Sequence, residues 1–342
     1  MIAREICYPR RMAPRRRGVQ LTPMETRRDV IVRAAMLADS LGYESFSLPE
    51  GWGFDSTLVL TEIALRTQRI TLVSGILSVW GRTPGTLAMN AATLHQISGG
   101  RYVLGLGPST RALVEGFHDV PFRHPADRLR DVTLAVRALL AGERIPLTAG
   151  SSAHPLRLGQ PAVPNLPIWI AAMGPHAVRV AAELSDGWMP AWVPRDRFAS
   201  WIPELTKMRA AASGGRPGPL TVVSGPTVVC DEDAEAARRG AASCAAWYLC
   251  AMGDVYARCV SEQGFAAEVA AIRAANPKPS LQKGLVPLEA QAALDQLTVY
   301  GTRAQVHAGL EQWDSVVDLV SIGLAPGMPW ESLETTLRAA AP

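Results

Sequence analysis

The feature that most constrains the fold of this 342-residue chain is a regular alternation of short apolar runs with amphipathic helical segments. Such a pattern is typical of parallel strands that are joined by helical crossovers. The sequence predicts eight strands, centred near Ile6, Phe46, Leu72, Val103, Ile168, Gly187, Val222 and Val320. Eight units without a break in composition favour one closed (β/α)8 TIM barrel over a two-domain doubly wound fold.

Two segments depart from the alternation and are expected to be insertions. Residues 143–165 are rich in Pro, Gly and Ser, and residues 254–298 are mostly helical with an interruption at 276–279. We therefore expect a single TIM-barrel domain over residues 1–342, with insertions near 143–165 and 254–298.

The N-terminal segment, residues 1–17, is strongly basic. It holds six arginines against one glutamate, whereas the whole chain has a net charge of only +3. One interpretation is a solvated arm. The other is a surface for an acidic partner, such as an acidic peptide or the anionic tail of a cofactor.

Composition excludes several classes of protein. No nucleic-acid-binding motif is present, and no basic face extends beyond the arm, so a nucleic-acid partner is not expected. No apolar run reaches the roughly 18 residues of a membrane-spanning helix, and no signal peptide is recognised. Five scattered cysteines without a CxxC pair indicate reduced thiols and a cytoplasmic location. The six histidines lack HxH or HExxH spacing, so no metal site is expected.

Two glycine-containing loops are expected at the carboxyl ends of strands. The strand at Tyr102–Leu106 runs into Gly107, Pro108, Ser109 and Thr110, and the strand near Ile168 runs into residues 173–177. In a barrel these ends meet at one mouth, where ligands bind. Each loop could be an ordinary strand-to-helix turn, but together they predict a phosphate site. Neither a Rossmann fingerprint, a P-loop nor a G-x-S-x-G motif is present.

A few side chains at the same mouth could carry chemistry. Glu50 is the best-placed carboxylate, with a helix cap or a salt bridge as the alternative role. His118 could contact substrate or be an ordinary loop residue. Trp52, Trp80 and Trp192 could line a substrate pocket as an aromatic wall, or could pack at the barrel rim.

Several runs of residues converge on one family. They are Leu37–Tyr43, Glu50–Asp55, Ser74–Pro84, Leu94–Arg101, Leu104–Ser109, Val114–His118, Ala171–Pro175 and Ala182–Trp188. In these runs, which span about residues 30–190, the chain resembles the bacterial-luciferase-like flavin and deazaflavin oxidoreductases, and among them the branch that uses coenzyme F420. The C-terminal third matches only weakly, through residues 299–302.

The resemblance implies where the cofactor binds. The family places the cofactor ring at the mouth of a TIM barrel, above a strand bulge with a non-proline cis peptide, here near Gly75–Ile76. The positions that correspond to the family's cofactor site are Glu50, Gly75, Ile76, Leu77, Ser78, Gly107, Pro108, Ser109, Ala172, Met173, Gly174, Pro175, His176 and Ala177.

The resemblance also implies a direction of reaction. Some relatives carry Asp-His where this chain has Glu50-Gly51, and they use the histidine as a base, so its absence argues against alcohol oxidation. We expect a reductase that transfers hydride from reduced coenzyme F420 to a C=C or C=N bond of a secondary metabolite or of a modified peptide containing a dehydroamino acid. Glu50, His118 or water would donate the proton. The alternatives are an FMN-dependent monooxygenase and a cofactor-free binding protein.

Two further expectations concern partners. Members of the family commonly form homodimers, which makes a homodimer the expected assembly. The substrate-binding wall is expected from the segments 143–165 and 254–298, where the match to the family fails.

Overall fold

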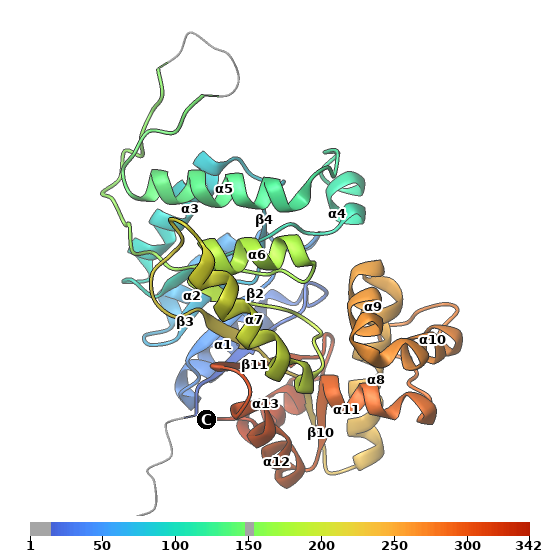
Figure 1. Ribbon diagram of the computed structural model, residues 1–342. Helices are drawn as coiled ribbons and strands as arrows, with labels where there is room; N and C mark the ends of the chain where they lie inside the picture. The colour runs from blue at the N-terminus through green and yellow to red at the C-terminus, as the bar shows by residue number, and fades with distance from the viewer. Residues whose placement is uncertain (1–14, 148–153) are drawn as a thin grey trace, which may run out of the picture.

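The computed structural model describes residues 15–147 and 154–342, and its centre is a closed barrel of parallel strands (Figure 1). The strands follow the order β1, β2, β3, β5, β6, β7, β8 and β11, and β11 pairs again with β1. The barrel strands are β1 (Arg17–Gln20), β2 (Ser45–Leu48), β3 (Thr71–Ser74), β5 (Tyr102–Gly107), β6 (Ile168–Ile170), β7 (Gly187–Trp188), β8 (Thr221–Ser224) and β11 (Leu319–Leu324). The prediction of a (β/α)8 barrel is confirmed.

Helices follow the strands and cover the outside of the barrel. The helices on the first part of the chain are α1 (Arg28–Leu41), α2 (Ser56–Arg66), α3 (Pro84–Ile97), α4 (Arg111–Gly116), α5 (Pro125–Leu140), α6 (Pro175–Leu184) and α7 (Phe198–Ala211). Local sequence sets their ends: Gly42 ends α1 with a φ of 86°, and Thr83 caps α3 just before Pro84.

The later helices are α8 (Ala234–Ala251), α9 (Asp254–Val260), α10 (Ala266–Ala275), α11 (Gln291–Leu297), α12 (Arg303–Asp314) and α13 (Trp330–Ala339). Short helical turns lie at Arg195–Arg197, Ser261–Phe265 and Leu288–Ala290. None of the helices in the described part of the chain has both the length and the apolar character that crossing a membrane requires.

The first strand differs from the prediction. The strand expected near Ile6 lies outside the described residues, and the barrel begins instead with β1 at Arg17. The predicted basic arm ended at this same residue, but the Arg17 side chain is fully buried and forms an ion pair of 2.7 Å with Asp314. A buried guanidinium with a carboxylate partner belongs to the barrel wall, so the arm as predicted extends too far.

The strand predicted near Val222 is β8, and a second strand follows it almost at once. Gly225 and Pro226 separate β8 from β9 (Thr227–Cys230), and β9 pairs with β11 and with β10 (Thr298–Gly301). A Cβ atom at Gly225 would lie 2.4 Å from the carbonyl oxygen of Ser321, so only glycine allows this close crossing. The extra pair of strands carries α8 to α11 to one side of the barrel, seen in orange in Figure 1.

The barrel has two apolar cores. One fills its interior with side chains from several strands, among them Val73 on β3, Val103 on β5 and Trp169 on β6. The larger one lies between the strands and the surrounding helices. The carboxyl end of the barrel is left open above the interior core, and that end holds the site described next.

Candidate functional site

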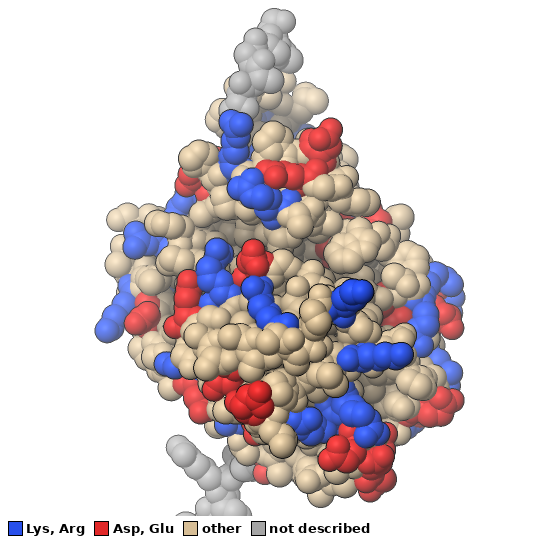
Figure 2. Space-filling model, turned by 90° about the vertical axis from the view of Figure 1, so that its right-hand side faces the viewer, with Lys and Arg blue, Asp and Glu red and all other residues tan. Residues whose placement is uncertain are grey.

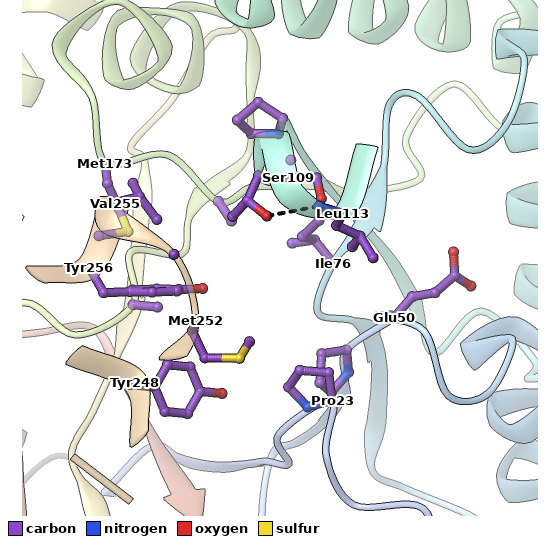
Figure 3. Close-up of a pocket in the computed structure, with 18 of the residues that line it drawn as sticks. Pro23, Glu50, Ile76, Ser109, Leu113, Met173, Tyr248, Met252, Val255 and Tyr256 are labelled. Atoms are coloured by element: carbon purple, nitrogen blue, oxygen red, sulfur yellow. Dashed lines mark hydrogen bonds between the residues drawn. The ribbon is translucent and has the colours of Figure 1, made fainter. Parts of the chain in front are cut away.

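A cavity of about 580 Å³ opens at the carboxyl ends of the strands. Its walls come from the loops after β1, β2, β3, β5, β6 and β7 on one side, and from the junction of α8 with α9 on the other (Figure 3). The sequence predicted that a ligand binds at the mouth of the barrel, and this cavity lies at that mouth.

The floor of the cavity is a bulge in the third strand. β3 ends at Ser74, and β4 (Leu77–Ser78) continues beside β5 in the same direction. Between the two strands, a cis peptide joins Gly75 to Ile76. This confirms the predicted bulge and its cis bond. A Cβ atom at Gly75 would lie 1.9 Å from the hydroxyl of Ser47, and one at Gly107 would lie 3.0 Å from the side chain of Ile76. The two glycines therefore let Ile76 form a flat apolar floor.

The next strands supply a polar rim. Ser109 has a φ of 59°, an uncommon conformation for a residue other than glycine, and Thr110 caps α4 through the backbone N–H of Leu113 at 3.4 Å. Gly174 precedes α6, whose first N–H groups have no side-chain cap. Open space surrounds Gly174, so these groups can face an anionic ligand.

Trp80 supports this rim from behind. Its indole N–H donates to the carbonyl of Pro108 at 3.0 Å, and its ring packs against Phe122 at 5.7 Å between centroids. Trp80 does not line the cavity. The structure therefore places it behind the predicted phosphate loop and not in the substrate pocket where the sequence predicted it.

Glu50 lies at the edge of the cavity and is held by a charge network. Its carboxylate accepts hydrogen bonds from Arg82, one of them at 2.8 Å, and from the backbone N–H of Ser56 at 3.2 Å. The bond to Glu50 raises the pKa of the Arg82 guanidinium, which also pairs with Asp55 at 2.7 Å. In Figure 3 the carboxylate points away from the centre of the cavity. Its role as a proton donor stays a prediction.

The wall opposite the floor is aromatic. Tyr248 on α8 stacks on Trp192 with 4.6 Å between ring centroids, and Tyr256 on α9 meets Tyr248 edge to face at 5.3 Å. Burial raises the pKa of Tyr256 to about 12 and the pKa of Tyr248 further above its usual value. Both phenols are therefore neutral and keep their protons near pH 7.

Most of the predicted site residues line this one cavity. These are Glu50, Trp52, Gly75, Ile76, Gly107, Pro108, Ser109, Ala172, Met173, Gly174, Ala177 and Trp192. Their segments are far apart in the sequence, and the barrel brings them together.

Other predicted residues lie near the cavity without lining it. Leu77 and Ser78 are buried in β4, and His176 is exposed near the start of α6, directly after Pro175. His118 packs against the ring of Phe117 at 5.1 Å, beside Gly81. Its predicted role as a proton donor also gains no support from this placement.

The residues that the sequence analysis missed lie on α8 and α9. Tyr248, Met252, Val255 and Tyr256 all line the cavity. Their spacing of i, i+4, i+7 and i+8 resembles one helical stripe, but Gly253 has a φ of 84° and ends the helix between them, so the periodicity alone does not bring these residues together. Of the two predicted insertions, 254–298 contributes its first turn to the wall, and the described part of 143–165 contributes nothing.

The family model for luciferase-like monooxygenases matches residues 11–318, and the chain belongs to this family. A Mycobacterium tuberculosis protein, named provisionally as a coenzyme F420-dependent oxidoreductase, is 32% identical over 251 residues, which cover 65% of this chain and 70% of that protein. A 5,10-methylenetetrahydromethanopterin reductase of Methanolobus tindarius is 28% identical over 163 residues, about half of each chain: 46% of this one and 48% of that protein.

Among solved structures, the coenzyme F420-dependent tetrahydromethanopterin reductase of Methanopyrus kandleri has a TM-score of 0.74 at 20% identity. The superposition covers 96% of this chain and 98% of that protein. This likeness confirms the barrel fold over nearly all of the chain.

Proposed function

We propose that this protein is a coenzyme F420-dependent oxidoreductase that acts as a reductase. The observation that carries the proposal is the shape of the cavity: an apolar floor at Ile76 and Gly107, continued by a rim with the uncapped N–H groups in the first turn of α6. A tricyclic ring with a phosphate-bearing side chain has these two requirements. The names of the relatives support coenzyme F420 over other ligands of that shape.

The described residues fit this cofactor. Ile76 and Gly107 would lie under the ring, and Ser109 and Gly174 would hold the phosphate. When bound in its reduced form, the deazaflavin supplies a hydride. Met173 and Met189 close the lining around the ring position and keep water out.

The proposed reaction is the reduction of a C=C or C=N bond in a small molecule or a modified peptide. Gly51 supports this direction, because it leaves the cavity without a histidine base beside Glu50. The arginines at 15–17 give no support for a peptide partner, since they form ion pairs with Glu311, Glu44 and Asp314. They also lie at the amino end of β1, at the opposite end of the barrel from the cavity.

The test is a titration of the purified apoprotein with coenzyme F420 and, separately, with FMN, followed by tryptophan fluorescence. Trp52 and Trp192 line the cavity and report on binding. We expect saturable quenching by coenzyme F420, at least 100-fold weaker binding in Gly107→Trp, and no change in Gly159→Trp. Gly159 has no atom within 4 Å of its Cβ position, so it is a matched control.

Two results would overturn the proposal. Tight binding of FMN without a response to coenzyme F420 would favour an FMN-dependent monooxygenase. Binding of neither would favour a non-catalytic binding protein with a barrel fold.

The expected homodimer and cytoplasmic location also belong to the proposal. Leu58 and Leu65 on α2 are exposed at 71% and 70%, an apolar pair that a second subunit would cover. Sedimentation of the protein with Leu58→Glu, compared with the unchanged protein, tests the dimer. The described cysteines at 230, 244, 250 and 259 are free thiols, which fits a reducing compartment.

A further inference from the structure

The aromatic wall contains a hydroxyl, that of Tyr256, without a hydrogen-bond partner among the described residues. Tyr256 lines the cavity, and its hydroxyl forms no hydrogen bond with the described residues. In Figure 3 that hydroxyl points into the cavity, toward the side on which Ile76 forms the floor. A phenol that stays protonated and has no hydrogen-bond partner in the protein can donate a hydrogen bond to an acceptor atom on a bound molecule.

The aromatic side of the cavity, opposite the floor and away from the rim at α6, restricts the charge of the part of a ligand that enters it. Among the described residues that line it, Glu50 is the one ionisable acid or base besides the tyrosines, and its carboxylate is already paired with Arg82. Tyr248, Tyr256 and Trp192 offer ring faces and edges close to Met252. The part of a substrate that enters here is therefore neutral and planar, because a charge would find no counter-ion.

Resting on the proposed reductase function, we propose that Tyr256 is the proton donor of the reaction, and that the substrate is a neutral molecule whose C=C bond is conjugated to a carbonyl group. The carbonyl oxygen would accept the hydrogen bond that Tyr256 now lacks. The conjugated plane would lie between the cofactor ring, which would cover Ile76, and the ring of Tyr256.

The proton and electron balance follows from this placement. The reduced deazaflavin, held over Ile76 and Gly107, would supply a hydride to the β-carbon, and the π electrons of the C=C bond would move to the carbonyl oxygen to give an enolate. Tyr256 transfers its hydroxyl proton to the enolate oxygen, and water returns a proton to the phenolate. The enol then becomes the saturated carbonyl compound in water. The substrate gains two hydrogens, and the deazaflavin is oxidised by two electrons.

Tyr248 is a positioning residue in this scheme. It lies between Trp192 and Tyr256, and its edge-to-face contact fixes the ring of Tyr256. Replacing it with phenylalanine keeps this contact, so Tyr248→Phe should leave the donor in place.

The experiment uses the apoprotein and 4-(dimethylamino)cinnamaldehyde, a neutral conjugated aldehyde. Its absorption band moves to longer wavelength when its carbonyl oxygen accepts a strong hydrogen bond. We expect this red shift with the unchanged protein, with Tyr248→Phe and with Tyr300→Phe, and its loss with Tyr256→Phe. Tyr300 accepts a bond from Gln291 at 2.8 Å and does not line the cavity, so it controls for the loss of one hydroxyl.

The loaded enzyme gives a second readout. Reduction of the probe by the protein with reduced coenzyme F420 should slow about 100-fold or more in Tyr256→Phe, the usual range for a lost general acid. The affinity for coenzyme F420 should stay the same, since Tyr256 lies across the cavity from the floor.

Each contrary outcome overturns a stated part of the inference. A red shift that persists in Tyr256→Phe, or disappears in Tyr248→Phe, excludes Tyr256 as the donor. No bound dye, or bound dye without a shift in the unchanged protein, excludes the conjugated carbonyl. Failure of coenzyme F420 to bind the unchanged protein would contradict the proposed function instead, and the dye result on the apoprotein would be read separately.

Discussion

The two walls of the cavity are built in different ways. On the floor side, Ile76, Gly107 and Gly174 follow directly from barrel strands, so the hydrogen-bonded sheet fixes their positions. On the aromatic side, Tyr248 and Tyr256 lie on helices that reach the mouth only because β9 leaves the barrel after Gly225 (Figure 1). The first wall is part of the barrel itself, and the second is attached to it.

The face of the molecule in Figure 2 shows no separation of basic from acidic side chains. In Figure 2, basic and acidic side chains are interspersed over the face that is turned to the viewer, with apolar and neutral residues between them. The contrast between the two walls is therefore a matter of how each is built and not of the charge around it.

This difference indicates that the floor side binds the cofactor and the aromatic side binds the substrate. A cofactor needs one exact geometry, and strand ends in a closed sheet supply it with little freedom. A substrate pocket built on added helices can change its side chains without disturbing the barrel. Substitutions on the floor side should therefore affect folding and cofactor binding, and those on the aromatic side should affect substrate alone.

The largest effect is expected from Gly105→Val on the floor side. A Cβ atom at Gly105 would lie 1.7 Å from the carbonyl oxygen of Ser74, and backbone cannot move aside as a flexible side chain can. We expect a loss of more than about 3 kcal/mol in the free energy of unfolding, measured by urea denaturation. Gly116→Ala, where nothing lies within 4 Å, should change it by less than about 1 kcal/mol. Equal stability of the two variants would contradict this view of the floor.

A smaller loss is expected from Asp186→Asn, at the amino end of β7. Its carboxylate accepts bonds from Arg137 at 2.8 Å, from Arg216 at 2.7 Å and from the N–H of Ile168 at 2.8 Å. The asparagine would leave Arg137 without its charge partner, at a cost of about 2–3 kcal/mol near neutral pH. Chemical denaturation of the variant and of the unchanged protein gives the difference.

The same substitution predicts a pH dependence. Burial would raise the pKa of Asp186, but the charge and hydrogen bond of Arg137 and the bond from Ile168 outweigh it and hold the pKa below its usual range. Because its pKa is lower in the folded protein, the ionised Asp186 carboxylate stabilises the fold above about pH 4. This stabilisation is lost as the pH falls through the lowered pKa and the carboxylate becomes protonated. The difference in stability between the unchanged protein and the Asp186→Asn variant should therefore narrow in acid. A stability difference that stays constant between neutral and strongly acidic pH would show that the negative charge of Asp186 does not stabilise the protein.

On the aromatic side, Trp192→Ala should raise the KM for the conjugated aldehyde probe about tenfold, because Tyr248 loses its stacking partner. Its effect on the affinity for coenzyme F420 should be less than about twofold in a fluorescence titration that compares variant with parent. Trp80→Phe tests the opposite wall. It removes the indole N–H that donates to the carbonyl of Pro108, so the affinity for coenzyme F420 should fall about fivefold while the KM for the probe stays unchanged. If both variants changed both constants alike, the two walls would not be independent.

The smallest effect is expected from Glu50→Gln. The side chains of Arg82 and Glu50 are only 13% and 12% exposed, but Arg82 keeps Asp55 as a charge partner and the amide oxygen of glutamine can still accept a hydrogen bond, so the free energy of unfolding should fall by about 1 kcal/mol, less than in Asp186→Asn. The rate of probe reduction should change by less than about threefold, well below the loss that removal of a general acid causes. A loss of about 100-fold would instead make Glu50 the proton donor that the sequence suggested and would remove that role from Tyr256.

Much of the floor side could be predicted from the sequence, because the signals are local. The bulge near Gly75–Ile76 lies where the family resemblance implied it, and seven of the eight predicted strand centres fall in or beside barrel strands. The aromatic side could not be predicted in the same way. Tyr248 and Tyr256 fall in two separate helices, and Gly253, with a φ of 84°, turns the chain between them.

The first strand shows the same limit. The sequence places Arg17 in a charged arm because an arginine is costly to bury, and only its pairing with Asp314, far along the chain, makes its burial possible. The sequence by itself determined the barrel, the family and the floor of the site, because strand periodicity and glycine positions act over a few residues. Tertiary structure alone decided which phenol faces the cavity and which carboxylate is already paired, because those facts depend on contacts between segments that the chain brings together only on folding.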